Sequence, residues 1–124
     1  MTQEDKELLL KDLCARLPYG VKIQVPYEDG SGYFDETVWE VNNDGPFHVN
    51  GWGIEYGYVK PYLFPLSSMT EKQKNEYQYI TERWMHDPSY SISDSIDWLN
   101  KYHFDYRGLI EKGLAIDATG LNIY

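Results

Sequence analysis

The amino-acid sequence predicts an α+β fold, with an N-terminal helix, a small antiparallel segment of four to five strands and two to three C-terminal helices. Three observations predict it: a helical spacing of apolar residues near the start, an alternating spacing in the middle, and capping sequences in the last third. Short, closely spaced strands favour an SH3-like barrel or a meander. Because the chain has 124 residues, we expect a single domain over residues 1–124.

The first helix is expected over residues 3–17. Thr2 precedes it as an N-cap, and the sequence PYG at residues 18–20 ends it. Four side chains recur at the spacing of one buried helical stripe: Leu10, Leu13, Cys14 and Leu17. Because Cys14 lies on this stripe and has no evident histidine partner, we interpret it as a small core side chain rather than a nucleophile.

A β-barrel-like segment is expected over residues 20–66. Apolar residues alternate with polar ones over residues 21–25, and turn-forming residues follow at 28–32. A second β-rich run covers residues 33–41, so the two runs predict a hairpin. The turn-forming sequence NDGP at residues 43–46 ends the second run.

Two further strands are expected in the same segment, at residues 47–50 and 54–58, with the Asn50-Gly51 turn between them. Residues 60–66 follow and contain two prolines. Because proline has no backbone N–H for a β-ladder, we interpret this stretch as an extended connector or an edge, not as a central strand.

The helical segment is expected over residues 70–112. Thr70 and Gln73 form a capping box for a helix over residues 71–84. Three residues mark its inner face: Tyr77, Ile80 and Trp84. The sequence DP at residues 87–88 then ends the helix.

A third helix begins after Ser91, with one face formed by four residues: Ile92, Ile96, Leu99 and His103. Asp105 is expected to cap a last short helical turn through Ile110, which Gly113 ends. Residues 113–124 remain as a tail that can add an extended segment.

The charge is strongly negative and uneven. There are 20 acidic and 11 basic residues, for a net charge of -9, and residues 20–58 contain seven acids against one lysine. This balance disfavours direct nucleic-acid binding and membrane-surface binding, because both partners are anionic. It favours a protein partner with a basic patch. The candidate binding residues are Glu28, Asp35, Glu36, Glu40, Trp52 and Tyr56. A sharper variant of this hypothesis is a mimic of nucleic-acid charge, which requires carboxylates spaced like phosphates.

The cysteine content and the hydropathy indicate a cytoplasmic protein. One cysteine cannot form an internal disulfide, and the first residues do not form a signal peptide. No apolar stretch approaches the length of a membrane-spanning helix. Metal-binding motifs are absent from the sequence, so we expect neither a metal nor a cofactor.

The competing hypothesis is an enzyme or small-ligand binder with an aromatic pocket between barrel and helices. Its candidate lining residues are Trp39, Trp52, Tyr56, Trp84 and Trp98. His86 and Asp87, beside Trp84, are candidates for a dyad, but we favour a role of His86 in stabilising the helix dipole from the last turn of the helix. No catalytic residue is assigned, and the sequence favours a non-enzymatic protein.

Three blocks carry a family resemblance: WLNKYHFDYRGLIEKGLA at residues 98–115, LFPLSSMT at 63–70 and LPYGVK at 17–22. With these blocks the chain resembles a family of small uncharacterised proteins in genomes, prophages and mobile elements of gut anaerobic bacteria. The resemblance implies an accessory role and assigns no catalytic residue. Five residues match the signature: Trp98, His103, Asp105, Tyr106 and Arg107. From the residues themselves, Asp105 and Arg107 suggest an ion pair at the junction after the third helix.

Overall fold

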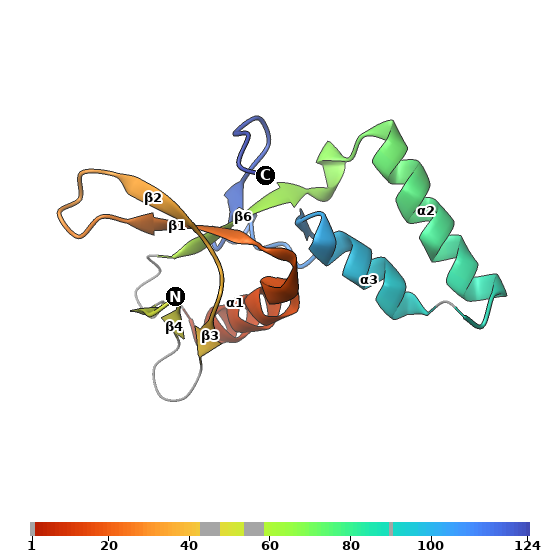
Figure 1. The fold of residues 1–124 in the computed structure, drawn as a ribbon, viewed down its shortest axis with the longest axis horizontal. Helices are drawn as coiled ribbons and strands as arrows, with labels where there is room; N and C mark the ends of the chain where they lie inside the picture. The colour runs from red at the N-terminus through yellow and green to blue at the C-terminus, as the bar shows by residue number, and fades with distance from the viewer. Residues whose placement is uncertain (1, 43–47, 54–58, 90) are drawn as a thin grey trace.

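The computed structural model describes residues 2–42, 48–53, 59–89 and 91–124, except for the side chain of Trp84. The fold is α+β, with an N-terminal helix, strands in the middle and helices after them, as the sequence predicts (Figure 1). The α-helices of the described residues are α1 (Gln3–Arg16), α2 (Glu71–His86) and α3 (Ile92–Lys101).

The described strands lie in two sheets rather than in one antiparallel meander. The larger sheet contains β1 (Lys22–Pro26), β2 (Tyr33–Thr37), β6 (Lys60–Pro65), β7 (Phe104–Asp105) and β8 (Ile116–Asp117). The smaller sheet contains β3 (Val41–Asn42), β4 (His48–Val49) and β5 (Trp52–Gly53). The larger sheet is mixed, because β7 and β8 both run parallel to β6.

The buried stripe of α1 differs in part from the prediction, although Leu10 and Leu17 do pack against the core. Leu9, Asp12, Leu13 and Arg16 are buried, whereas Cys14 is exposed. The interpretation of Cys14 as a core side chain is therefore wrong. The helix turns Asp12 and Arg16 inward because each neutralises the other: Arg16 Nε donates to Asp12 Oδ2 over 2.8 Å.

The predicted hairpin is confirmed by β1 and β2, which pair antiparallel with Gln24 opposite Asp35. The second strand ends at Thr37, earlier than predicted, because Val41–Asn42 pairs with β4 in the other sheet. Asn50 and Gly51 connect β4 to β5 with positive φ angles of 52° and 82°, as the predicted turn requires. The predicted turn at 43–46 and the predicted strand at 54–58 lie outside the described residues.

The prediction for residues 60–66 is wrong, because β6 is a central strand. Phe64, which lies between the prolines, donates its N–H to His103, and the Leu63 carbonyl accepts from Ala118. Since consecutive residues in a strand direct their backbone groups to opposite edges, β7 and β8 lie on opposite edges of β6. Pro65 is the last residue of the strand and Pro61 is the second. The prolines therefore lie near the ends of β6, and the residues between them supply the backbone groups for both ladders.

The segment after α3 begins with the strand Phe104–Asp105 (β7), so the predicted cap residue lies in a strand. The turn that follows covers residues 109–113, later than the predicted turn through Ile110. The capping part of the prediction is confirmed, since the Asp105 carboxylate accepts from the N–H groups of Leu109 and Ile110. The tail also supplies the predicted extended segment, β8.

The two C-terminal helices lie side by side and project away from the sheets (Figure 1). The predicted helix over residues 71–84 continues to His86, and Tyr77 and Ile80 contact the cluster around Trp98. The predicted face of α3 is wrong in part: Leu99 is buried, but Ile92 and Ile96 are exposed, and His103 lies beyond the helix end. The helix buries a different face because Trp98 and Leu99 are the residues that pack on Phe104.

Candidate functional site

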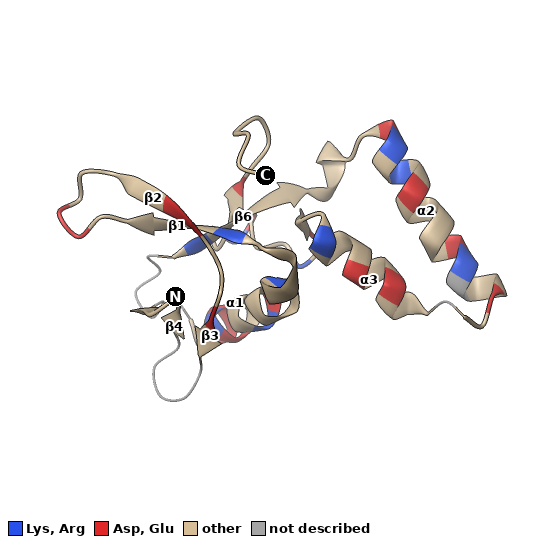
Figure 2. Cartoon of the chain, in the orientation of Figure 1, with Lys and Arg blue, Asp and Glu red and all other residues tan. Residues whose placement is uncertain are grey.

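The β1–β2 hairpin with the following residues 38–40, here called the acidic hairpin, has a concentrated negative charge. Figure 2 shows acidic positions at its tip and along β2. Its carboxylates are Glu28, Asp29, Asp35, Glu36 and Glu40. Its one lysine, Lys22, donates from Nζ to the carbonyl of Ile123 over 2.8 Å. The hairpin therefore presents a net negative surface.

Asp35 lies on the outer face of the hairpin. Its Oδ1 accepts a hydrogen bond of 2.6 Å from the hydroxyl of Tyr62, which in turn accepts one of 3.0 Å from Gln24. Burial and the neighbouring Asp35 raise the pKa of the Tyr62 hydroxyl. The Asp35 side chain thus stays exposed to a partner while Tyr62 fixes its position.

Glu36 points to the opposite face of β2 and has a structural role that the sequence did not indicate. Its Oε2 accepts from Trp52 Nε1 over 3.0 Å and from Asn50 Nδ2 over 3.2 Å. Glu36 therefore joins the hairpin to the β4–β5 turn. Because Asp35 and Glu36 face opposite ways, these carboxylates do not form one row, which disfavours the nucleic-acid mimic.

Glu28 and Glu40 are both exposed, and no hydrogen bond or ion pair of their side chains is found among the described residues. Two large aromatic side chains on the same hairpin are also exposed, Tyr33 by 63% and Trp39 by 66%. Tyrosine and tryptophan suit protein interfaces, since each combines a large apolar ring with a polar tip. Charge and aromatic surface therefore occur together here.

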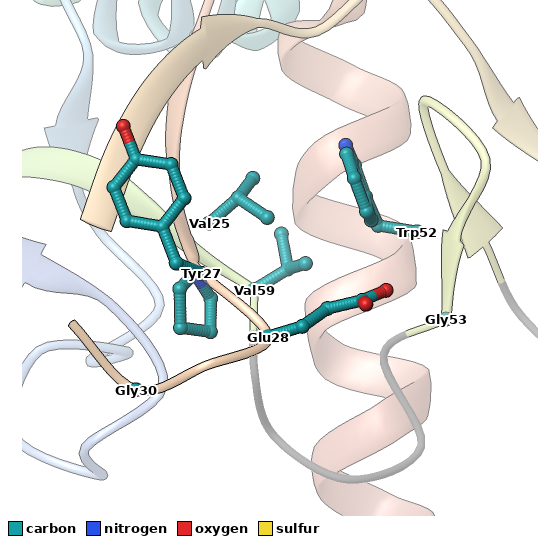
Figure 3. Close-up of a pocket in the computed structure, with 8 residues that line it drawn as sticks. Val25, Tyr27, Glu28, Gly30, Trp52, Gly53 and Val59 are labelled. Carbon is teal, nitrogen blue, oxygen red and sulfur yellow. The ribbon is translucent and has the colours of Figure 1, made fainter. Parts of the chain in front are cut away.

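A cavity of about 650 Å³ opens on the inner side of the hairpin (Figure 3). Tyr27 and Trp52 stand on opposite sides of it, with Val25 and Val59 between them and Glu28 at its border. The cavity lies beside the hairpin, not between barrel and helices as predicted from the sequence. Of the predicted lining residues, Trp52 contributes to it. Tyr56 and the side chain of Trp84 lie outside the described residues, and Trp98 is buried against α2.

Of the residues that match the signature, Asp105, Tyr106 and Arg107 follow one another in the chain, and the last two lie at a buried ion cluster. The Asp12 carboxylate accepts from Arg16 and, over 2.8 Å at its other oxygen, from Arg107 Nη1. The expected partner of Arg107 was Asp105, but that carboxylate caps the turn at Leu109 instead. Tyr106 lies with its ring against both guanidinium groups, at 5.3 Å from Arg16 and 4.5 Å from Arg107. These contacts join α1 to the segment after β7.

The other two signature residues pack on aromatic rings. Trp98 stacks on Phe104 with ring centroids 5.7 Å apart. His103 stacks on Tyr124 at 3.7 Å, and burial together with the nearby positive charge of Arg16 lowers the pKa of His103 to about 4. The imidazole is therefore neutral at pH 7. Two buried atoms in the described residues, His103 Nδ1 and Arg16 Nη1, have no hydrogen-bond partner.

Tyr124, whose role no sequence pattern indicates, completes the larger sheet. Its hydroxyl accepts from the backbone N–H of Lys22 and donates to the carbonyl of Tyr62, each over 2.8 Å. These two residues follow the last β1–β6 pair, Ile23 with Pro61, so the hydroxyl replaces a direct ladder bond. Burial raises the pKa of this hydroxyl.

No metal-binding arrangement appears in the described ranges. Groups of three or more histidine, cysteine or acidic side chains that could hold a metal are absent there. His86 is exposed in the last turn of α2, and the Asp87 carboxylate accepts from Ser89. Among the described helices, none is long and apolar enough to span a bilayer.

Comparison with known proteins adds no homologue to this geometry: the chain matches no family model, no curated protein and no solved structure.

Proposed function

We propose that the chain is a protein-binding accessory module, which binds a basic partner through the acidic hairpin. The observation that carries the proposal is the pairing of charge with exposed aromatic surface. Glu28 and Glu40 have exposed carboxylates, while Tyr33 and Trp39 offer large rings beside them. A basic partner neutralises the carboxylates, and the rings supply the apolar contact that most interfaces contain.

The internal bonds of the hairpin support the proposal, because they make it a rigid platform. Trp52 and Asn50 hold Glu36 on the inner side, and Tyr62 holds Asp35 on the outer side. A partner then meets the exposed Asp35 carboxylate at a position that is already fixed, which lowers the entropy cost of binding.

The test is capture of partners from a lysate of the organism that encodes the chain, at low and high ionic strength. The double variant Glu28→Lys/Glu40→Lys should lose a stoichiometric partner, and high salt should release it. The matched control is Asp97→Lys/Glu111→Lys, which makes the same charge change on other exposed positions. Equal loss of the partner in both variants would contradict the proposal.

A second candidate function is small-ligand binding in the cavity beside the hairpin. Its volume of about 650 Å³ is in the range of ligand pockets, and Val25, Val59 and Trp52 make it largely apolar. A ligand library screened by the fluorescence shift of Trp52 tests it, with Trp52→Phe as the control for the signal. Ligands whose fluorescence shift disappears in Trp52→Phe would support binding in this cavity. If no ligand shifts the fluorescence, protein binding remains as the proposed function.

A further inference from the structure

We infer that the free edge of β2 binds an extended basic segment of the partner as an added antiparallel strand. This inference rests on the proposed function and names its mode of binding. Among the described strands, β2 is the last one in the larger sheet, with β1 on one side only. An extended peptide can therefore continue the sheet by pairing with backbone groups of β2.

The hydrogen bonds of the hairpin identify the groups that point outward. Tyr27 N–H donates to Gly32, and Val38 N–H donates to Val21. Both pairs fit the register of β1 and β2, in which hydrogen-bonded and non-hydrogen-bonded pairs alternate. The backbone groups of residues 34 and 36 therefore face β1, and those of residues 33, 35 and 37 face the free edge.

Asn50 shows that this edge accepts an amide partner. Its side chain donates to the Thr37 carbonyl over 2.9 Å and accepts from the Trp39 N–H over 2.8 Å, as a neighbouring strand would. Beyond Asn50, the N–H and C=O groups of Tyr33 and Asp35 have no hydrogen bond within the described residues. They are two donors and two acceptors at the spacing of an antiparallel ladder.

The side chains at these positions specify the chemistry of the added strand. Asp35 carries its carboxylate on the exposed outer face, and Tyr33 lies two residues away on the same face. A residue that forms a hydrogen-bonded pair with Asp35 has its own side chain on that face, so a lysine or arginine there meets the carboxylate. A second copy of this chain fits poorly, because symmetric pairing of β2 sets the acidic strands of two chains against each other.

The probe is a capped octapeptide that alternates lysine with threonine or valine. Two N-methylated forms carry equal numbers of methyl groups. One form is methylated on the backbone nitrogens of the lysines, and the other on the backbone nitrogens of the threonines and valines. In the added strand the lysine N–H groups point to β2 and the others point away. Methylation of the lysine backbone nitrogens should weaken binding by at least about tenfold, whereas the other methylated form should bind like the parent peptide. The protein is unchanged in this comparison, so folding does not affect it.

A charge variant gives a second readout. Asp35→Asn keeps an acceptor for Tyr62 and removes one charge, so it should weaken the parent peptide severalfold, and Asp97→Asn on α3 should not. Equal binding of both methylated forms would overturn strand addition and leave the acidic hairpin as a charged surface. Failure of the parent peptide to bind at low ionic strength would also overturn it, while the lysate capture still tests the proposed function. Self-association that strengthens in Asp35→Asn would identify a second copy as the occupant instead.

Discussion

Arg107 donates to the carboxylate of Asp12 over 2.8 Å, although 95 positions separate the two residues in the chain. The other oxygen of Asp12 accepts from Arg16, so one buried carboxylate serves two guanidinium groups. The signature residue Arg107 thereby has a structural partner in α1. The contact fixes the segment after β7 against the first helix, which is a structural role.

Replacement of Asp12 by alanine should lower the free energy of unfolding by about 3–5 kcal/mol, because it leaves the buried guanidinium of Arg16 and the partly buried one of Arg107 without their anion. Lys11→Ala, at the adjacent exposed position, should change it by no more than about 0.5 kcal/mol. Urea denaturation of both variants measures this. Similar values for the two would show that the ion cluster does not stabilise the fold.

Tyr124→Phe removes the hydroxyl that bridges Lys22 and Tyr62 and keeps the ring against His103. The variant should lose about 1–3 kcal/mol of stability, since two backbone groups lose their partner. Tyr33→Phe removes a hydroxyl from an exposed ring and should have little effect. Thermal unfolding of the two variants distinguishes them, and an unchanged Tyr124→Phe would show that solvent satisfies the two groups.

The pH dependence of stability should contain a contribution from His103. Its pKa is about 4 in the folded chain against an ordinary value of 6.5, so between these values the unfolded state binds more protons. The free energy of unfolding should therefore fall as the pH falls from about 6.5 to about 4. His103→Asn keeps a residue that tolerates the positive φ of 63° and removes the titrating ring. Denaturation at several pH values should give a shallower slope in this window for the variant, and identical slopes would contradict the assignment.

Glu36→Ala should lower the stability by about 1–3 kcal/mol, because Trp52 Nε1 and Asn50 Nδ2 lose a shared acceptor. Glu28→Ala, at the exposed tip of the same hairpin, should be close to neutral. Urea denaturation followed by tryptophan fluorescence measures both. If the two variants are equally stable, Glu36 belongs with the surface carboxylates and not with the link between the sheets.

Local patterns predicted the helices, the hairpin and the Asn50-Gly51 turn, because capping groups, alternation and positive-φ residues act over a few positions. The role of β6 was missed, since the two prolines argue against a central strand unless the partners of Phe64 and Leu63 are known. Those partners lie about 40 to 55 residues later in the chain, and no local sequence pattern predicts that such distant segments pair parallel to β6.

The buried face of α1 was misplaced for a different reason. A hydrophobic stripe assigns Asp12 and Arg16 to solvent, but their i,i+4 spacing allows a buried pair with each other. That spacing was a signal in the sequence, whereas the third member, Arg107, was not predictable as its partner. Among the candidate binding residues, Glu36 has an internal partner that only the contact between the two sheets reveals.

The most direct test of the acidic hairpin as the binding surface is amide hydrogen exchange, residue by residue, on the chain alone and with the captured partner. Alone, the amides of Tyr33 and Asp35 should exchange fast and those of Phe34 and Glu36 slowly, because the hairpin bonds alternate. With the partner bound, the amides of Tyr33 and Asp35 should become protected while those on the exposed side of α2 stay unchanged. Protection centred on α2 and α3, with the hairpin unaffected, would contradict the account.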